Sequence, residues 1–111
     1  MDTQVRHDSS KRPIGRWSAS VEIGRKAILL VKGVIPIDGR NRSFTLKTAD
    51  ARHVDPSILI LEVNPAVAVW DGDVEVEVYY SEILDRYDQY TSVLIKGNGR
   101  QLAIFDVEKK K

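Results

Sequence analysis

The sequence predicts an all-β protein, an antiparallel two-sheet sandwich of about seven short strands. Three observations support this fold class. Apolar and polar residues alternate along several segments, turn-forming residues recur at short intervals between them, and no segment has a sustained helical pattern. The strand count and spacing are typical of an immunoglobulin-like architecture. The Cys–Trp–Cys spacing of true immunoglobulin domains is absent, because the chain contains no cysteine.

A length of 111 residues indicates one domain, and a composition that is 42% hydrophobic and 30% charged is typical of soluble globular proteins. We expect residues 1–16 to form a disordered lead, because they mix charged and small residues without a period. The β-sandwich domain then covers residues 17–108, and residues 109–111 form a basic tail. The absence of cysteine excludes disulfide bonds, thiolate catalysis and cysteine-ligated zinc.

The first half of the domain contains three predicted strands. Residues 17–23 alternate and place their apolar side chains on one face. Residues 27–35 form an apolar run that predicts a buried strand. Pro36 indicates that this strand ends or lies at an edge, since proline has no N–H for the sheet. A third strand follows in residues 42–48, with its apolar residues facing inward.

The second half contains the remaining strands. Residues 58–63 and 66–70 are two apolar runs, and residues 74–80 show the cleanest alternation in the chain, with valines on one face and glutamates on the other. Residues 91–107 predict a β-hairpin. Its turn is Asn98-Gly99, a pair that readily adopts the two positive φ angles of a type I′ turn.

One segment, residues 82–89, has a helix-like pattern. Ile83, Leu84, Tyr87 and Tyr90 follow one another at spacings that place them on one helical face. A single helical turn near this segment is therefore an alternative to a simple connection between two strands.

The distribution of charge argues against nucleic acid as the main partner. The chain has a net charge of +1, of which the lead contributes +2 and Lys109–Lys111 contribute +3, so the domain between them is acidic. A nucleic-acid-binding domain concentrates positive charge on its folded surface. The lead contains no apolar stretch of a secretory signal, and no apolar run is long enough to span a membrane. We therefore expect a cytoplasmic protein with no membrane partner.

Patterns that carry catalysis are missing. The two histidines, His7 and His53, do not fit a serine–histidine–aspartate arrangement, and no glycine-rich loop precedes a helix. We expect a non-enzymatic protein without a cofactor.

Four acidic residues stand at alternate positions before and within the predicted strand at residues 74–80: Asp71, Asp73, Glu75 and Glu77. Carboxylates are calcium ligands, so Asp71 and Asp73 are weak candidates for a metal site. Side chains two residues apart on a strand lie roughly 7 Å from one another, which is too far for all four to share one ion. We favour a solvated strand face that also protects a sheet edge.

The final hairpin is a candidate interface. A two-residue turn pairs Gly97 with Arg100 and predicts that Ile95 faces Leu102 and Val93 faces Ile104. The opposite face then carries three apolar residues: Leu94, Ala103 and Phe105. The solvent-facing side of an antiparallel strand is normally polar, so this face is expected to be covered by a partner or by the chain itself.

All four tyrosines lie between positions 79 and 90. Tyr80 is in phase with the valines and is expected in the core. Tyr87 or Tyr90 occupies the position of a tyrosine corner, in which the hydroxyl binds the backbone. Tyr79 and one of the later pair, for which we take Tyr87, remain as exposed rings beside carboxylates, an arrangement used to bind proteins or sugars.

The sequence thus predicts a non-enzymatic module that self-associates or docks on a protein partner, through Leu94, Ala103, Phe105, Tyr79 and Tyr87. A carbohydrate-binding module that uses Tyr79, Trp70 and Tyr87 is the alternative. A calcium-assisted module is a weaker one.

Overall fold

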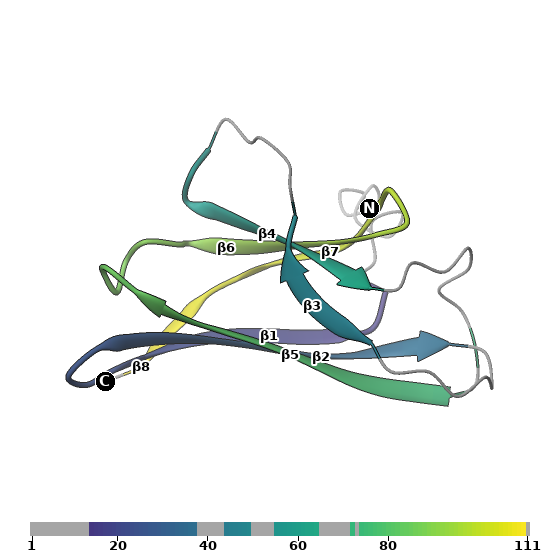
Figure 1. The fold of residues 1–111 in the computed structure, drawn as a ribbon, viewed down its shortest axis with the longest axis horizontal. Coiled ribbons are helices and arrows are strands. Elements are labelled where there is room, and N and C mark those ends of the chain that lie inside the picture. Colours follow the sequence, from purple (N-terminus) through teal and green to yellow (C-terminus); the bar gives the residue numbers. More distant parts are fainter. Residues whose placement is uncertain (1–13, 38–43, 50–54, 65–71, 73, 111) are drawn as a thin grey trace, which may run out of the picture.

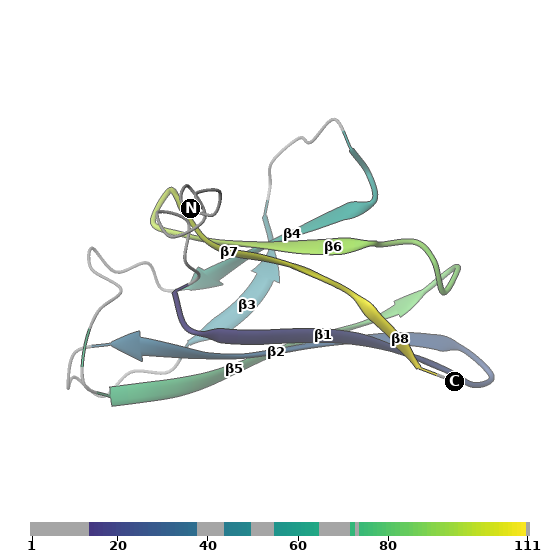
Figure 2. The same cartoon turned by 180° about the vertical axis from the view of Figure 1, so that it is seen from behind.

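The fold is a β-sandwich, as the sequence predicts. The computed structural model describes residues 14–37, 44–49, 55–64, 72 and 74–110. These residues form eight strands and no helix, in two four-stranded sheets that pack face to face (Figures 1 and 2). No helix in this part of the chain is long and apolar enough to cross a membrane.

Strands distant in sequence combine to form each sheet. Sheet A has the order β5-β2-β1-β8 and sheet B the order β3-β4-β6-β7. In chain order the strands are β1 (Arg16–Ile23), β2 (Ala27–Ile37), β3 (Thr45–Thr48), β4 (Ile58–Asn64), β5 (Val74–Leu84), β6 (Ser92–Gly97), β7 (Arg100–Asp106) and β8 (Glu108–Lys110).

β2 is one of the two inner strands of sheet A and pairs with both β1 and β5. It pairs with β1 from Ile23↔Ala27 to Arg16↔Val34 and with β5 along all of its 11 residues. Beyond Val34 only β5 accompanies β2, so Pro36 lies where one side of the strand is free of β1. This position agrees with the predicted edge and with the missing N–H of proline.

Not all pairings are antiparallel. β1 pairs with β2, β2 with β5, β3 with β4, and β6 with β7 in the antiparallel sense, but β1–β8 and β4–β6 are parallel. The β1–β8 pair arises because the chain changes sheets at Val107, which is buried between β7 and β8. Lys109 and Lys110, expected in a tail, instead belong to β8.

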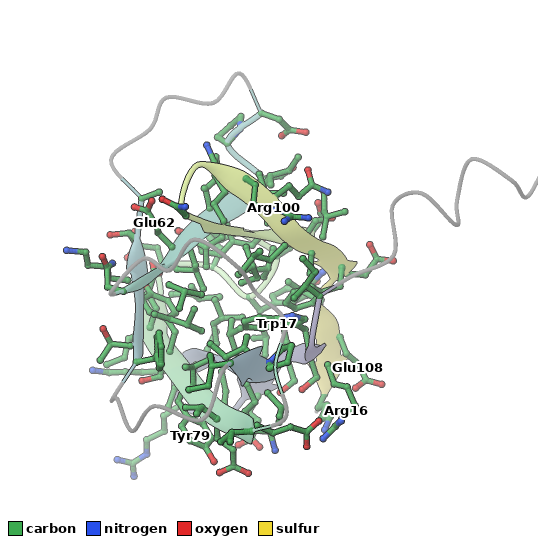
Figure 3. The ribbon with its side chains drawn as sticks, turned by 90° about the vertical axis from the view of Figure 1, so that its right-hand side faces the viewer. Arg16, Trp17, Glu62, Tyr79, Arg100 and Glu108 are labelled. Atoms are coloured by element: carbon green, nitrogen blue, oxygen red, sulfur yellow. The ribbon has the colours of Figure 1, made fainter. Side chains whose placement is uncertain are left out.

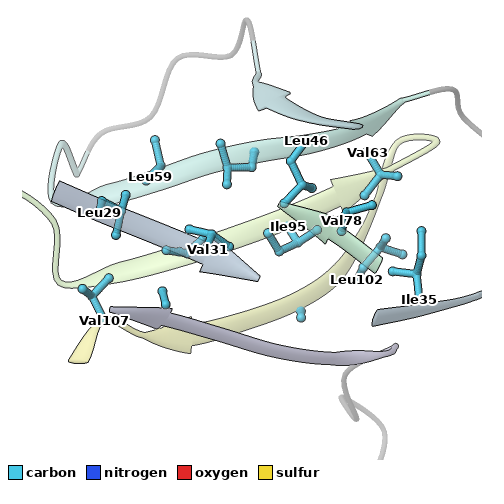
Figure 4. Close-up of a cluster of buried hydrophobic side chains, with 14 of the residues drawn as sticks. Leu29, Val31, Ile35, Leu46, Leu59, Val63, Val78, Ile95, Leu102 and Val107 are labelled. Atoms are coloured by element: carbon cyan, nitrogen blue, oxygen red, sulfur yellow. The ribbon is translucent and has the colours of Figure 1, made fainter. Parts of the chain in front are cut away.

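The core consists of alternate side chains of both sheets, as in other sandwiches (Figure 4). The fully buried residues with the largest side chains are Leu29, Ile35, Leu61, Ile95 and Leu102. Trp17 closes this core at the side formed by β1 and β7. Its ring lies against the backbone of Gly33, where a Cβ atom would collide with it, and it stacks on Phe105 with ring centroids 6.1 Å apart.

Trp17 holds Ile14, just before β1, in place. Trp17 Nε1 donates a 2.7 Å hydrogen bond to the carbonyl oxygen of Ile14, and the Ile14 N–H donates to the carbonyl of Leu102 in β7. Gly15 between them has a φ of +88°, a conformation that favours glycine. Residues 14–16 therefore contact the sandwich, although they lie in the segment predicted to be a disordered lead.

The predicted helical turn near residues 82–89 is wrong. β5 continues to Leu84, and the pairing with β2 extends through Ile28↔Ile83 and Ala27↔Leu84. Ile83 is 61% exposed whereas Leu84 is buried, so the two side chains lie on opposite faces of a strand. Pairing with β2 keeps this segment in the extended conformation of a strand. The chain then reverses through a tight turn in which Gln89 N–H donates to the Arg86 carbonyl.

The register predicted for the last hairpin is wrong by one residue. Asn98 and Gly99 have φ angles of 52° and 80°, as expected for the turn, and Gly97 pairs with Arg100. The register then shifts between Ile95 and Lys96, so that Ile95 faces Ala103 rather than Leu102. One extra residue in β7 makes a β-bulge, and every position beyond it changes face.

Candidate binding surface

The outer face of sheet A combines aliphatic side chains at one end with polar ones at the other. At the aliphatic end Ile28 is 45% exposed and Leu30 is 36% exposed, both on β2, and Ile83 on β5 lies directly opposite Ile28. The outer face of a half-buried antiparallel sheet is normally polar. Three neighbouring exposed aliphatic side chains therefore make this end a candidate contact surface.

Tyr79 occupies the middle of the same face. It lies on β5 opposite Lys32 and is 54% exposed. Its hydroxyl donates a 2.7 Å hydrogen bond to Glu77 Oε1. This bond, together with the charge of the carboxylate, raises the pKa of Tyr79. Figure 3 shows Tyr79 on the side of the molecule away from sheet B, whereas Trp17 lies between the sheets.

An ion pair lies at the polar end of the face. Arg16 on β1 donates two hydrogen bonds, of 2.8 and 3.2 Å, to the two carboxylate oxygens of Glu75 on β5. The hydrogen bonds and the opposite charge lower the pKa of Glu75 and raise that of Arg16. Both side chains are exposed, so the pair orients the two groups more than it stabilises the fold.

A shallow depression of about 340 Å³ lies between the ion pair and Tyr79. Its walls include Arg16, Lys32, Glu77 and Tyr79, and its floor includes Gly33 and Val34 of β2. It thus presents the Tyr79 ring, the Glu77 carboxylate and the cations of Arg16 and Lys32 on an open sheet surface, and Trp17 and Ser18 of β1 also line it.

The remaining predicted tyrosine, Tyr87, does not join Tyr79. β5 continues five residues past Tyr79, roughly 17 Å of strand, before the turn that contains Tyr87. Tyr87 is exposed on that turn. The two rings therefore do not form one platform.

The structure divides the apolar residues predicted for the hairpin. Ala103 is buried, and Phe105 packs between the sheets against Trp17, so this chain itself covers both. Leu94 does face outward, and its neighbour there is Ile104, which is 53% exposed. The bulge in β7 causes this exchange, because it turns Ala103 and Phe105 inward.

Tyr80 and Tyr90 meet at a shared carboxylate. The hydroxyl of Tyr80 donates a 2.7 Å hydrogen bond to Glu82 Oε1, and that of Tyr90 donates a 3.3 Å bond to Oε2. Partial burial is the main cause that raises the pKa of both phenols. Tyr80 packs against the core as predicted. The predicted tyrosine corner is wrong, because the Tyr90 hydroxyl binds a side chain rather than the backbone and Tyr87 is exposed.

The metal candidates Asp71 and Asp73, and Trp70 of the carbohydrate alternative, lie outside the described residues. Within the described ranges no group of three or more His, Asp or Glu side chains could hold a metal ion. Glu75 and Glu77, the other acids of the predicted row, are engaged by Arg16 and Tyr79.

Sequence reasoning missed the aliphatic end of the surface. The run at residues 27–35 predicted a buried strand, but only alternate residues such as Leu29 and Val31 are buried. The signal was present in β5, where continuing the alternation of residues 74–80 places Ile83 in phase with Tyr79. Comparisons with protein-family models, curated proteins and solved structures found no match for the chain.

Proposed function

We propose that the chain is a non-enzymatic binding module that self-associates or docks on a protein partner, in the cytoplasm as the sequence indicates. The outer face of sheet A is the contact surface. The observation that carries this proposal is the group of exposed aliphatic side chains Ile28, Leu30 and Ile83 on two paired strands.

The chemistry of this face suits a protein surface. Aliphatic and aromatic side chains supply most of the energy at the centre of protein interfaces, and charged groups at the rim orient the partner. Here the aliphatic end is continuous with Tyr79, and the Arg16–Glu75 pair stands beyond it. An immunoglobulin-like architecture would agree with this role, since such sandwiches present faces and loops for contact.

The test compares matched variants as bait. The double variant Ile28→Ser/Leu30→Ser removes two side chains of the aliphatic end, and Ile104→Ser removes an exposed aliphatic side chain from sheet B. A protein captured from a cell extract by the wild type and by Ile104→Ser, but not by the double variant, is then purified and its affinity measured. We expect the double variant to bind it at least about tenfold more weakly, since each buried aliphatic side chain contributes roughly 1.5–3 kcal/mol. If every captured protein binds the double variant equally well, the face is not the site.

A carbohydrate ligand is the second candidate, favoured by the depression beside Tyr79. The Tyr79 ring offers an apolar face to a sugar, and Glu77 and Lys32 offer hydrogen-bonding groups within the same 340 Å³ depression. A glycan array probed with the wild type and Tyr79→Ala tests it. Binding that is lost in the variant supports this candidate, and an array without any bound glycan removes it.

A further inference from the structure

The four edge strands of the sandwich differ in how well they are protected against pairing with another chain. An edge strand exposes unpaired N–H and C=O groups, and proteins block such edges with short strands, charged residues, bulges or covering segments. β3 has four residues and β8 has three, all three of them charged. β7 contains the bulge, and the Ile14 N–H already occupies the carbonyl of Leu102.

β5 carries charged residues, namely Glu75, Glu77 and Glu82, but among the described residues it shows none of the other devices. It is 11 residues long, contains no proline or glycine, and keeps an unbroken register with β2 from Val74 to Leu84. In the part of the chain that is described, no strand pairs with its other side. Figure 1 shows β5 and β3 on the near side of the sandwich, and Figure 2 shows β8 and β7 on the opposite side.

We propose that β5 pairs with β5 of a second copy of this chain, antiparallel and about a twofold axis at Tyr79, so that the two A sheets form one eight-stranded sheet. This inference is independent of the outer-face proposal, because it uses the edge of sheet A rather than its face. An isologous contact of this kind closes as a dimer and leaves no further β5 edge.

The length of β5 and its charges together favour this register. The strand carries three acids, Glu75, Glu77 and Glu82, and no base. Pairing centred on Tyr79 uses all 11 residues and places each acid of one copy opposite a neutral residue of the other. The pairs are Glu75 with Ile83, Glu77 with Ser81, and Glu82 with Val76. Registers centred on Val76 or Glu77 instead place glutamates directly opposite each other, which is unfavourable.

The same register gives Tyr79 a role. The two Tyr79 rings, each half-exposed in the single chain, become directly opposed neighbours on the outer face of the joined sheet. Cross-strand aromatic pairs stabilise antiparallel sheets. Each Tyr79 hydroxyl can keep its hydrogen bond to Glu77 of its own chain in this arrangement.

The first experiment measures association by sedimentation of the full chain from micromolar to millimolar concentration. We expect a reversible monomer–dimer equilibrium that strengthens with added salt, because salt screens repulsion between the acids of the two copies. Tyr79→Lys places two lysines opposite each other and should weaken the dimer about tenfold. Ser81→Lys faces Glu77 of the second copy and should strengthen it by a similar factor. Gln101→Lys on β7 adds the same charge on the far side and should change nothing.

The second experiment uses the absence of cysteine in the chain. Residues directly opposite in an antiparallel pair have Cα atoms about 4.5–5.5 Å apart, within disulfide reach. Tyr79→Cys should therefore form a covalent dimer on mild oxidation. Glu77→Cys and Ser81→Cys should each remain uncrosslinked alone, since identical positions are then about 14 Å apart, but should crosslink when the two variants are mixed.

Several outcomes overturn the proposal. The first is a chain that stays monomeric at millimolar concentration. The second is a dimer that is abolished by Ile28→Ser/Leu30→Ser but unaffected by Tyr79→Lys. An extended basic peptide as the true occupant would bind more weakly as salt rises and would leave Tyr79→Cys monomeric. If the chain forms no dimer but still captures a protein through Ile28 and Leu30, only this inference is contradicted. If the chain forms the dimer but captures no protein through these residues, only the proposed function is contradicted.

Discussion

The edge strands β5 and β7 differ in one respect that determines how well their faces could be predicted. β5 keeps one register with β2 over its whole length, so its side chains alternate between the inner and outer faces from Val74 to Leu84. β7 contains one bulge, and Ala103 and Phe105 beyond it point into the sandwich rather than out of it. Alternation therefore predicts faces only while the register is unbroken, since a shift of one residue exchanges the two sides of a strand.

The largest expected effect comes from the face exchange in β7. Phe105→Ala removes the ring that stacks on Trp17 and should lower the free energy of unfolding by about 2–4 kcal/mol. Ile104→Ala removes an exposed side chain and should change it by no more than about 0.5 kcal/mol. Urea unfolding of both variants checks this pair. If Ile104→Ala cost more than Phe105→Ala, the result would support the register expected from the sequence and contradict the bulge.

The end of β5 offers the corresponding test on the other strand. Leu84→Ala should cost about 2–3 kcal/mol, because the side chain is buried, whereas Ile83→Ala should have little effect. A helical turn would bury both residues on one face and make the two costs similar. Urea unfolding of the two variants decides between the strand and the turn.

A smaller effect on stability is expected from Tyr80, which faces the core side of β5 while its neighbour Tyr79 faces outward. Burial and the bond to Glu82 raise the pKa of Tyr80 above the ordinary value of 10.0, so the folded state keeps its proton at a pH where the unfolded state loses it. The stability that this group contributes is therefore complete below about pH 10 and falls as the pH rises further. The unfolding free energy of Tyr80→Phe should decline less steeply above that pH than that of the wild type. Equal slopes would show that the Tyr80 hydroxyl does not contribute.

The smallest effect is expected at the exposed end of β5. Glu75→Gln breaks the pair with Arg16, and because both groups are exposed the melting temperature should fall only slightly. Arg16 lowers the pKa of Glu75. The contribution of this ion pair to stability is therefore present above the ordinary carboxyl pKa of 4.5 and disappears as the pH falls. The difference between variant and wild type should therefore vanish in acid and in high salt. A difference that persists in acid would assign another role to Glu75.

Much of the candidate surface could be predicted from local pattern. Tyr79 was expected to be exposed beside acids, and the structure places it there with its hydroxyl on Glu77. Ile28 and Leu30 could not be assigned, because an apolar run does not reveal which of its faces a second sheet covers. The face of Phe105 could not be predicted either, since no residue type in β7 indicates a bulge.

The sequence by itself determined the all-β class, the position of the Asn98-Gly99 turn and the inward side of β1 and β5, because these depend on residues a few positions apart. Only the tertiary structure decided that β8 joins β1, that β4 and β6 run parallel, and that Trp17 meets Gly33 and Phe105. Those contacts join segments distant along the chain. Their geometry is set by the packing of two sheets against each other, a property that no single strand contains.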